Sequence, residues 1–192
     1  MHLACVVVLA LAALVPFAED GKWGYRDDDG RVAIPPRYEI AREFSAAGIA
    51  AVVDEKGWAY IDRSGRVLVR PLAVDNGPDY FREGLARFRN DDRVGFFDRR
   101  GRVVIQASYT FARPFVEGRA AVCNGCAEIM EGEHLAVRGG KWGFIDRRGR
   151  IVISLRFAEA GDFSNGLAQV RAGTKWQQIG KDGTFAPRVA PR

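Results

Sequence analysis

Short apolar runs alternate with glycine-containing polar segments along most of the chain, a pattern typical of β-strands joined by tight turns. One set of runs is rich in β-branched residues and begins two positions after a glycine, at residues 32–34, 67–69, 103–105 and 151–153. A second set begins at a glycine, at residues 48–52, 84–88, 118–122 and 166–170. We therefore predict an all-β protein made of short antiparallel strands.

The tryptophans mark a repeat. Trp23, Trp58, Trp142 and Trp176 share one position of it, which Val94 takes in the third copy. The interval is about three dozen residues, except before Trp142, where about a dozen residues are inserted. Repeats are therefore predicted at 21–53, 54–89, 90–138 with an inserted loop at 123–138, 139–171, and partially at 172–185, followed by a tail at 186–192.

Each repeat is predicted to hold about three antiparallel strands, with a tight turn after the first. A glycine lies seven residues after the tryptophan position, at Gly30, Gly65, Gly101, Gly149 and Gly183. An aspartate precedes it by three residues in the first four copies, at Asp27, Asp62, Asp98 and Asp146. Glycine supplies the positive φ that such a turn needs, and the aspartate can accept hydrogen bonds from turn amides.

The first strand alternates in the manner of a pleated strand. Trp58 and Tyr60 are expected on one face, and Ala59 and Ile61 on the other. We interpret the small residue after each tryptophan as a shallow spot against which a neighbouring aromatic ring lies. The aromatic stripe is expected in the repeat core, formed by Trp23, Trp58, Trp142 and Trp176.

Two segments carry a family resemblance. KWGYRDDDGRVAIPPRYEIAREF from Lys22, and KWGFIDRRGRIVI with FSNGLAQV between Lys141 and Val170, resemble units of the WG-repeat family. The resemblance covers residues 21–185 and implies a bacterial β-repeat protein that serves as a binding or scaffold module. It brings no catalytic residues with it. The implied fold is a repeat array of stacked three-stranded antiparallel units, either open like a solenoid or curved towards a propeller.

The amino-terminal apolar run at residues 3–15 is shorter than the roughly 20 residues of a spanning helix and has the length of a secretory signal core. We predict a signal peptide at residues 1–18, cleaved after Ala18, and therefore an exported protein with no transmembrane span. The alternative is that this run forms an apolar first strand of the fold.

The inserted loop carries a Cys-x-x-Cys motif at Cys123 and Cys126. We favour a local disulfide, because removal of Cys5 with the leader leaves an even pair in an oxidising compartment. A redox pair expects a helix amino terminus in a βαβ unit, which this pattern lacks. A zinc site would use Cys123, Cys126 and His134, with Glu131 or Glu133 as the fourth ligand. Free thiols are the remaining possibility.

Arginines gather at the predicted hairpin tips. The chain has 29 basic and 24 acidic residues, a net charge of +5. If the repeats stack in register, the tips form one basic stripe for phosphate or carboxylate groups. The tip at 27–31 is acidic and would interrupt it, and the alternative is that charged tips are simply solvated. The predicted binding residues are Arg63, Arg66, Arg99, Arg100, Arg102, Arg147, Arg148 and Arg150.

No hydrolase, zinc-protease or phosphate-loop motif is present, and His2 and His134 are the only histidines. We therefore predict a non-catalytic binding or scaffold protein that needs no cofactor. Its partner is expected to be a protein or an anionic cell-surface polymer and not a nucleic acid. The alternative is a redox or zinc-dependent protein centred on Cys123 and Cys126.

Overall fold

A computed structural model describes residues 13–132 and 134–187 of the chain. Within these ranges the chain is built of strands and turns, and no helix is long and apolar enough to cross a membrane. The all-β prediction is therefore confirmed. Two compact units divide between Val67 and Leu68, and each is described by itself.

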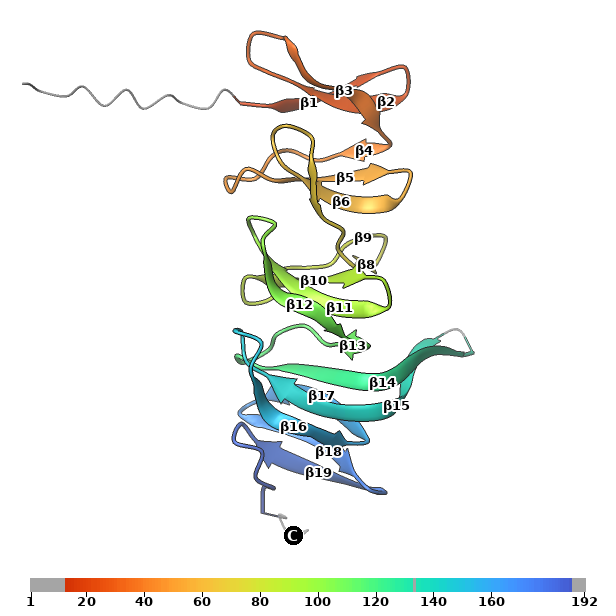
Figure 1. The fold of residues 1–192 in the computed structure, drawn as a ribbon, viewed down its shortest axis with the longest axis vertical. Helices are drawn as coiled ribbons and strands as arrows, with labels where there is room; N and C mark the ends of the chain where they lie inside the picture. Colours follow the sequence, from red (N-terminus) through yellow and green to blue (C-terminus); the bar gives the residue numbers. More distant parts are fainter. Residues whose placement is uncertain (1–12, 133, 188–192) are drawn as a thin grey trace, which may run out of the picture. The chain divides into compact units, whose positions relative to one another are not determined.

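Unit 1 contains two sheets (Figure 1). The first has the order β1-β2-β3, with antiparallel pairing throughout. The second has the order β4-β5-β6-β7, and the two units divide within β7. The strands are β1 (Val15–Glu19), β2 (Lys22–Arg26), β3 (Val32–Tyr38), β4 (Ile40–Ala41), β5 (Ala50–Asp54), β6 (Gly57–Ile61) and β7 (Val67–Val69).

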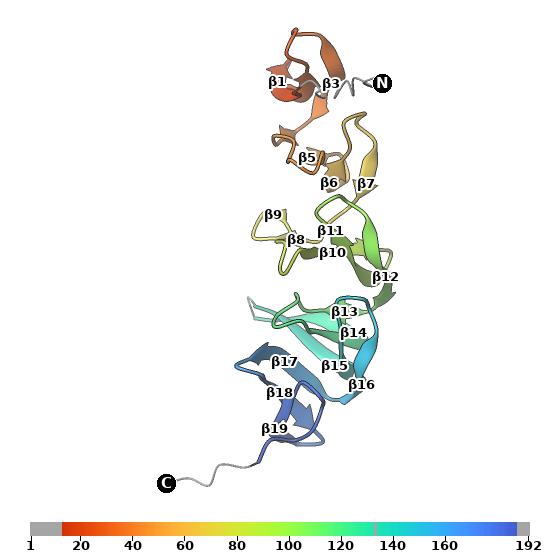
Figure 2. The ribbon, with the colours of Figure 1, turned by 90° about the vertical axis from the view of Figure 1, so that its left-hand side faces the viewer.

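Unit 2 contains the sheets β8-β9, β10-β11-β12, β13-β14-β15-β16 and β17-β18-β19, and the last three follow one another in chain order (Figure 2). Their strands are β8 (Ala73–Val74), β9 (Gly77–Pro78), β10 (Leu85–Asn90), β11 (Arg93–Asp98), β12 (Val103–Tyr109), β13 (Phe111–Ala112), β14 (Ala120–Glu131), β15 (His134–Ile145), β16 (Ile151–Phe157), β17 (Glu159–Ser164), β18 (Leu167–Ala172) and β19 (Lys175–Gly180).

The sheets are offset from the sequence repeats by one strand. Three sheets join the last strand of one repeat to the first two strands of the next, through β5-β6-β7, β10-β11-β12 and β14-β15-β16, and the last sheet joins β18 to the first strand of the partial repeat, β19. Neighbouring repeats are thereby hydrogen-bonded along whole strands, for example from Leu85↔Asp98 to Asn90↔Arg93. In the first sheet β1 holds the position that the last strand of the preceding repeat holds in the other sheets, because β1 pairs with β2.

The predicted signal peptide, residues 1–18, overlaps this first strand. Residues 1–12 lie outside the described part of the chain, whereas β1 includes the last four residues before the predicted cut. Leu14 also packs against the core cluster around Tyr25. These residues are therefore part of the folded sheet, as the alternative of a first strand expects for them.

The small residue after the tryptophan faces backbone. An added Cβ at Gly143 would lie 2.5 Å from the carbonyl oxygen of Ile153 and 2.8 Å from the nitrogen of Leu155. Gly24 and Gly95 are equally tight against β3 and β12, and the paired strands shift register beside each of the three glycines. The bulged second strand thus occupies the space expected for an aromatic ring; only at Gly95 does a ring, that of Phe88, also approach.

The aromatic residue two positions after the tryptophan forms the core instead. Tyr25, Phe96 and Phe144 are fully buried, and each meets the linker phenylalanine of its own repeat edge to face. The ring centroids are 4.8 Å apart for Tyr25 and Phe44, 4.8 Å for Phe96 and Phe115, and 4.9 Å for Phe144 and Phe163. These geometries are those that aromatic quadrupoles favour.

The tryptophans do not share one environment. Trp142 is buried, whereas Trp23 and Trp58 are only half-buried. Trp176 is 55% exposed, so its assignment to the core is wrong. It lies on β19, an edge strand of the last sheet, after which the described chain forms only the isolated bridge between Ile179 and Phe185.

In four of the five hairpin tips, the glycine lies against an aliphatic residue in the second strand of the preceding repeat, whereas nothing lies within 4 Å of an added Cβ at Gly30. An added Cβ at Gly101 would lie 2.7 Å from Leu68 Cδ1, and one at Gly149 would lie 3.2 Å from Ile105 Cγ2. Gly183 approaches Ile153, and in unit 1 Gly65 approaches Ile34, in the same way. All four glycines have positive φ, so both the turn and the packing exclude a side chain.

We predict that Gly101→Ala destabilises the protein more than Gly118→Ala. The two glycines have φ of +74° and +76°, so both substitutions cost about 1–2 kcal/mol for a left-handed alanine. Only Gly101 meets a neighbour, and the clash with Leu68 adds about 1–3 kcal/mol. Urea unfolding of the two variants measures the difference, and equal losses would contradict this packing role.

Candidate binding site

The aspartate of each hairpin tip organises its own turn. Asp98 Oδ1 accepts hydrogen bonds from the amides of Arg100 (2.9 Å) and Arg102 (3.0 Å), and Oδ2 accepts from Arg102 Nε (2.8 Å). The Gly101 amide donates to the carbonyl of Asp98 at 2.9 Å. Asp62 and Asp146 repeat this arrangement with Arg66 and Arg150. The geometry confirms the prediction that the aspartate accepts hydrogen bonds from the turn amides.

These contacts change the acidity of the aspartates. Partial burial raises the pKa of the Asp98 carboxyl, but hydrogen bonds from the Arg102 side chain and from the amides of Arg102 and Arg100 outweigh burial. The net pKa lies below its ordinary value. The same balance lowers the pKa of Asp62 and of Asp146. The ionised carboxylate is therefore the form that the folded turn stabilises.

Fewer of the predicted arginines are available to form the basic stripe than the sequence suggests. Arg66, Arg102 and Arg150 each form an ion pair with the aspartate of their own turn, at 3.2, 2.7 and 2.6 Å. Arg63 and Arg99 lie over the rings of Phe44 and Phe81. Five of the eight predicted binding residues are thus engaged within the protein.

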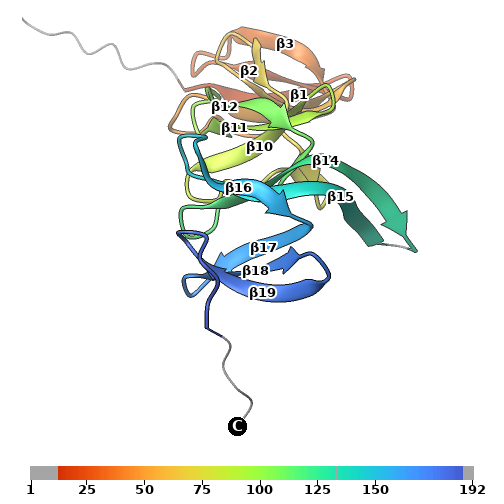
Figure 3. The same ribbon diagram turned by 60° about the horizontal axis from the view of Figure 1, so that its bottom comes forward.

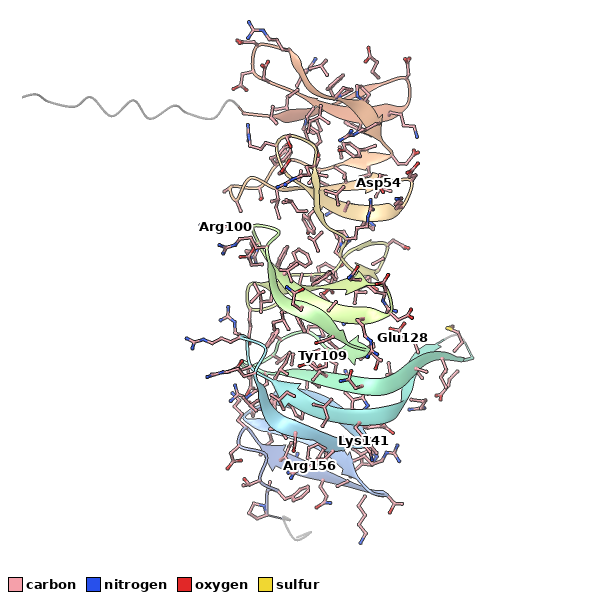
Figure 4. All side chains as sticks on the ribbon, viewed as in Figure 1. Asp54, Arg100, Tyr109, Glu128, Lys141 and Arg156 are labelled. Carbon is pink, nitrogen blue, oxygen red and sulfur yellow. A yellow bond between two sulfur atoms is a disulfide. The ribbon has the colours of Figure 1, made fainter. Side chains whose placement is uncertain are left out.

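Three exposed arginines remain, all in unit 2: Arg100, Arg147 and Arg148, which we call the arginine edge. In the described part of the chain, none of the three has a carboxylate within ion-pair distance. Figure 4 shows Arg100 at the outer end of its turn, on the opposite side of unit 2 from Glu128 and Lys141. The turns containing the edge follow strands β11 and β15, and their glycines pack on residues of unit 2 as described above.

The first and last tips differ from this pattern. At the first tip, Arg31 pairs with Asp29 at 3.3 Å, so the acidic character expected from the sequence persists. At the last tip, Gly180 takes the aspartate position, and its amide donates to Thr184 O at 2.8 Å. Asp182 caps this turn by accepting from the Thr184 amide.

The insertion forms a hairpin and not a loop. β14 and β15 stay in one register from Ala120↔Ile145 to Glu131↔His134, and the ribbon extends away from the rest of unit 2 (Figure 3). We call residues 126–139 the arm. Gly125 and Gly140 lie opposite each other at its base, both with positive φ, which interrupts the regular pleat there. The two glycines suggested turns at these positions, and no local feature of the sequence indicated that β14 and β15 continue through them.

Cys123 and Cys126 form a disulfide with Cα atoms 6.2 Å apart. The zinc alternative requires His134 beside them. The register places His134 opposite Glu131, five residue pairs beyond Cys126, or about 17 Å along the ribbon. The structure therefore brings the two cysteines together and leaves the proposed histidine ligand at the far end of the arm.

Comparison with known proteins decides the family. The WG containing repeat matches four times, at residues 23–58, 58–93, 95–125 and 142–176. The chain belongs to the WG-repeat family. A search of curated proteins finds no match. The WG-repeat matches leave residues 126–141 uncovered, a stretch that contains the whole arm.

A groove lies between the arm and the last sheet of these WG repeats. It encloses about 500 Å³ and contains residues of β13, β15, β17, β18 and β19. Sequence reasoning missed it because its walls come from segments far apart in the chain. The one sequence signal was Trp176 in a truncated repeat, where no following strand can cover the ring. The groove is lined by Phe111, Arg113, Ala136, Val137, Arg138, Trp142, Glu159, Ala160, Gly161, Gln169 and Trp176.

We predict that Asp98→Asn makes unfolding less sensitive to acid. Because the pKa of Asp98 is lowered in the folded state, its contribution to stability is present above about pH 4 and is lost as pH falls through the folded pKa. The melting temperature of the variant should be lower than that of the wild type at pH 7, and the difference between the two melting temperatures should decrease towards pH 3. Asp92→Asn, in the exposed β10–β11 turn, is the control. A difference independent of pH would contradict this role.

We also predict that the cysteines are oxidised and metal-free. Mass spectrometry of the purified protein should show a gain of about two daltons on reduction, and no mass loss with a zinc chelator. Reduction should cost about 2 kcal/mol of stability, since the closed loop is short. A chelator-sensitive mass would favour the zinc alternative instead.

Proposed function

We propose that this WG-repeat protein is an exported, non-catalytic binding or scaffold protein that holds its partner through the arginine edge. The observation that carries the proposal is the exposure of Arg100, Arg147 and Arg148 while the other tip arginines are engaged internally. Because the other predicted tip arginines contact an aspartate or an aromatic ring of the protein, these three are the ones most accessible to a ligand.

Phosphate and carboxylate groups are the chemistry that suits this edge. An exposed guanidinium offers paired donors to either group, and several on successive turns favour a ligand with repeated anionic groups. An acidic protein surface and an anionic cell-surface polymer share this chemistry. Such binding is electrostatic and is expected to weaken as salt screens it.

A non-catalytic role is supported by what the titratable groups do in the described chain. The carboxylates of Asp62, Asp98 and Asp146 are committed to turn amides and arginine. Both described cysteines are committed to the disulfide. The recurring polar residues of the repeat therefore hold the fold together.

Export is supported by the apolar run at residues 3–15 and by the disulfide, which persists in oxidising compartments. A cut after Ala18 would remove all of β1 except Glu19 and would leave β2 as an edge strand. The small-residue sequence Ala10-Leu11-Ala12 offers a second site, and a cut after Ala12 would preserve β1. The mass spectrum that tests the disulfide also identifies the mature amino terminus.

We predict that the double substitution Arg100→Glu and Arg148→Glu abolishes binding to an anionic polymer. The probe is immobilised alginate, a carboxylated polysaccharide, measured by surface plasmon resonance at low and physiological salt. Wild-type binding should fall steeply between the two salt conditions, because exposed charges are screened within about 8–10 Å. The variant should show no binding at either.

The matched control is Arg93→Glu with Lys141→Glu, which changes the net charge equally. Arg93 begins β11 at the end away from Arg100, and Lys141 lies in β15 well before Arg148. This control should retain alginate binding. Equal loss in both double variants would mean that net charge, and not the arginine edge, attracts the polymer. An acidic protein that binds while alginate does not would identify the partner class as protein.

A further inference from the structure

The groove beside the arm differs in chemistry from the arginine edge. Phe111 and Trp142 meet edge to face at one wall, with ring centroids 5.6 Å apart. Trp176 lies at the opposite sheet, 55% exposed. The groove's volume of about 500 Å³ is within the range of small-ligand pockets. Aromatic walls with a few polar side chains are typical of such sites.

Trp176 is placed as an open platform. It pairs in register with Arg171, so the two side chains share the outer face of the last sheet. Gln169 is two residues before Arg171 on the same strand and therefore shares this face. Opposite them, Gly161 contributes no side chain, which leaves the groove open at β17. A large apolar ring kept at the surface beside a hollow is the arrangement of a binding surface.

The groove wall also contains a buried hydrogen-bond donor without an acceptor. Trp142 is only 3% exposed, and in the described chain nothing accepts a hydrogen bond from its Nε1. Arg113 Nε, also in the groove lining, is buried and unsatisfied as well. A buried donor without a partner costs about 1–3 kcal/mol, so such groups usually have an acceptor in the functional state. Neither atom has accessible surface in this structure, so these donors do not themselves identify the ligand.

The charges of the groove are already balanced. Arg113 pairs with Asp162 at 3.7 Å, Arg138 with Glu131 at 2.7 Å, and Glu159 with Arg171 at 2.6 Å. An anionic or cationic ligand would therefore have to break an existing ion pair. The balance favours a ligand that is uncharged but rich in hydroxyl and ether oxygens.

We propose that this groove binds a neutral oligosaccharide. The apolar C–H face of a pyranose ring suits the exposed Trp176 indole. Gln169 offers an amide that both donates and accepts. A site of this kind needs no catalytic group, and it is separate from the arginine edge.

An extended peptide fits the groove less well. A peptide strand would add to β17, which is an edge strand of the last sheet. The register of β17 shifts between Ala160 and Phe163, within the stretch that lines the groove. Such an irregularity interrupts the row of backbone groups that a continuing strand requires.

The test titrates the full chain with three probes: cellotriose, maltotriose and triacetylchitotriose. Binding of one of them should shift tryptophan emission to shorter wavelength and release heat in calorimetry. Trp176→Ala should weaken this binding about tenfold or more, since it removes the aromatic platform. Gly161→Leu should do the same by filling the groove. An added Cβ at Gly161 meets only Gln169 O at 3.5 Å, so the fold tolerates the side chain.

Two control variants show whether binding depends on the groove itself. Tyr80→Ala removes an equally exposed aromatic ring of unit 2 and should leave oligosaccharide binding unchanged. Arg100→Glu with Arg148→Glu should also leave oligosaccharide binding unchanged. The proposals for the groove and for the arginine edge can therefore be contradicted independently of each other.

Three results would overturn the proposal. One is the absence of binding by all three oligosaccharides up to about 10 mM. Another is binding that survives both Trp176→Ala and Gly161→Leu. The third is that a pool of extended hexapeptides binds the wild type but neither Trp176→Ala nor Gly161→Leu, while no oligosaccharide binds. The groove would then be a peptide site.

Discussion

The absence of a Cβ at the hairpin tip is the constraint on which the repeat packing depends. Gly65, Gly101, Gly149 and Gly183 each adopt a φ that side chains disfavour, and each brings its turn against an aliphatic residue of the preceding sheet. The neighbouring aspartate satisfies the amides that this tight turn exposes. In three turns, an arginine then pairs with that aspartate. Turn geometry and packing against the preceding repeat thus follow from one glycine in four of the five repeats, and the arginine–aspartate pair accompanies it in three of them.

Much of the fold could be predicted because its signals are local. Glycine and aspartate mark turns through their own backbone preferences, and β-branched runs mark strands. The offset of sheets from repeats could not be predicted, since strand pairing joins residues of different repeats. The same limit explains the tryptophans. Their recurrence indicated a shared position, but burial depends on the neighbouring strand, and within residues 13–132 and 134–187 no further strand pairs with β19 beside Trp176.

The candidate sites show the same division between local and long-range information. Arginines at the tips were visible in the sequence, whereas their neutralisation by Asp98 and Asp146 depends on side-chain geometry within the turn. A buried ion pair in the irregular second repeat was not expected at all. There Arg87 meets Asp79 at 2.8 Å and also donates to the carbonyl of Ala112. Counting charges therefore overestimated the surface available to a partner.

The arm separates what this chain shares with its family from what is its own. The first four tips, their glycines and their aspartates lie within the matched WG repeats, and three of the arginines around them serve the turn. The arm lies between two matches, and it contributes Ala136, Val137 and Arg138 to the groove. A repeat array gains specificity most easily where an insertion meets a regular surface, because the insertion can change without disturbing the stacking glycines. In the proposed function the arginine edge would attract ligands by charge alone, and the groove formed with the arm would distinguish one ligand from another.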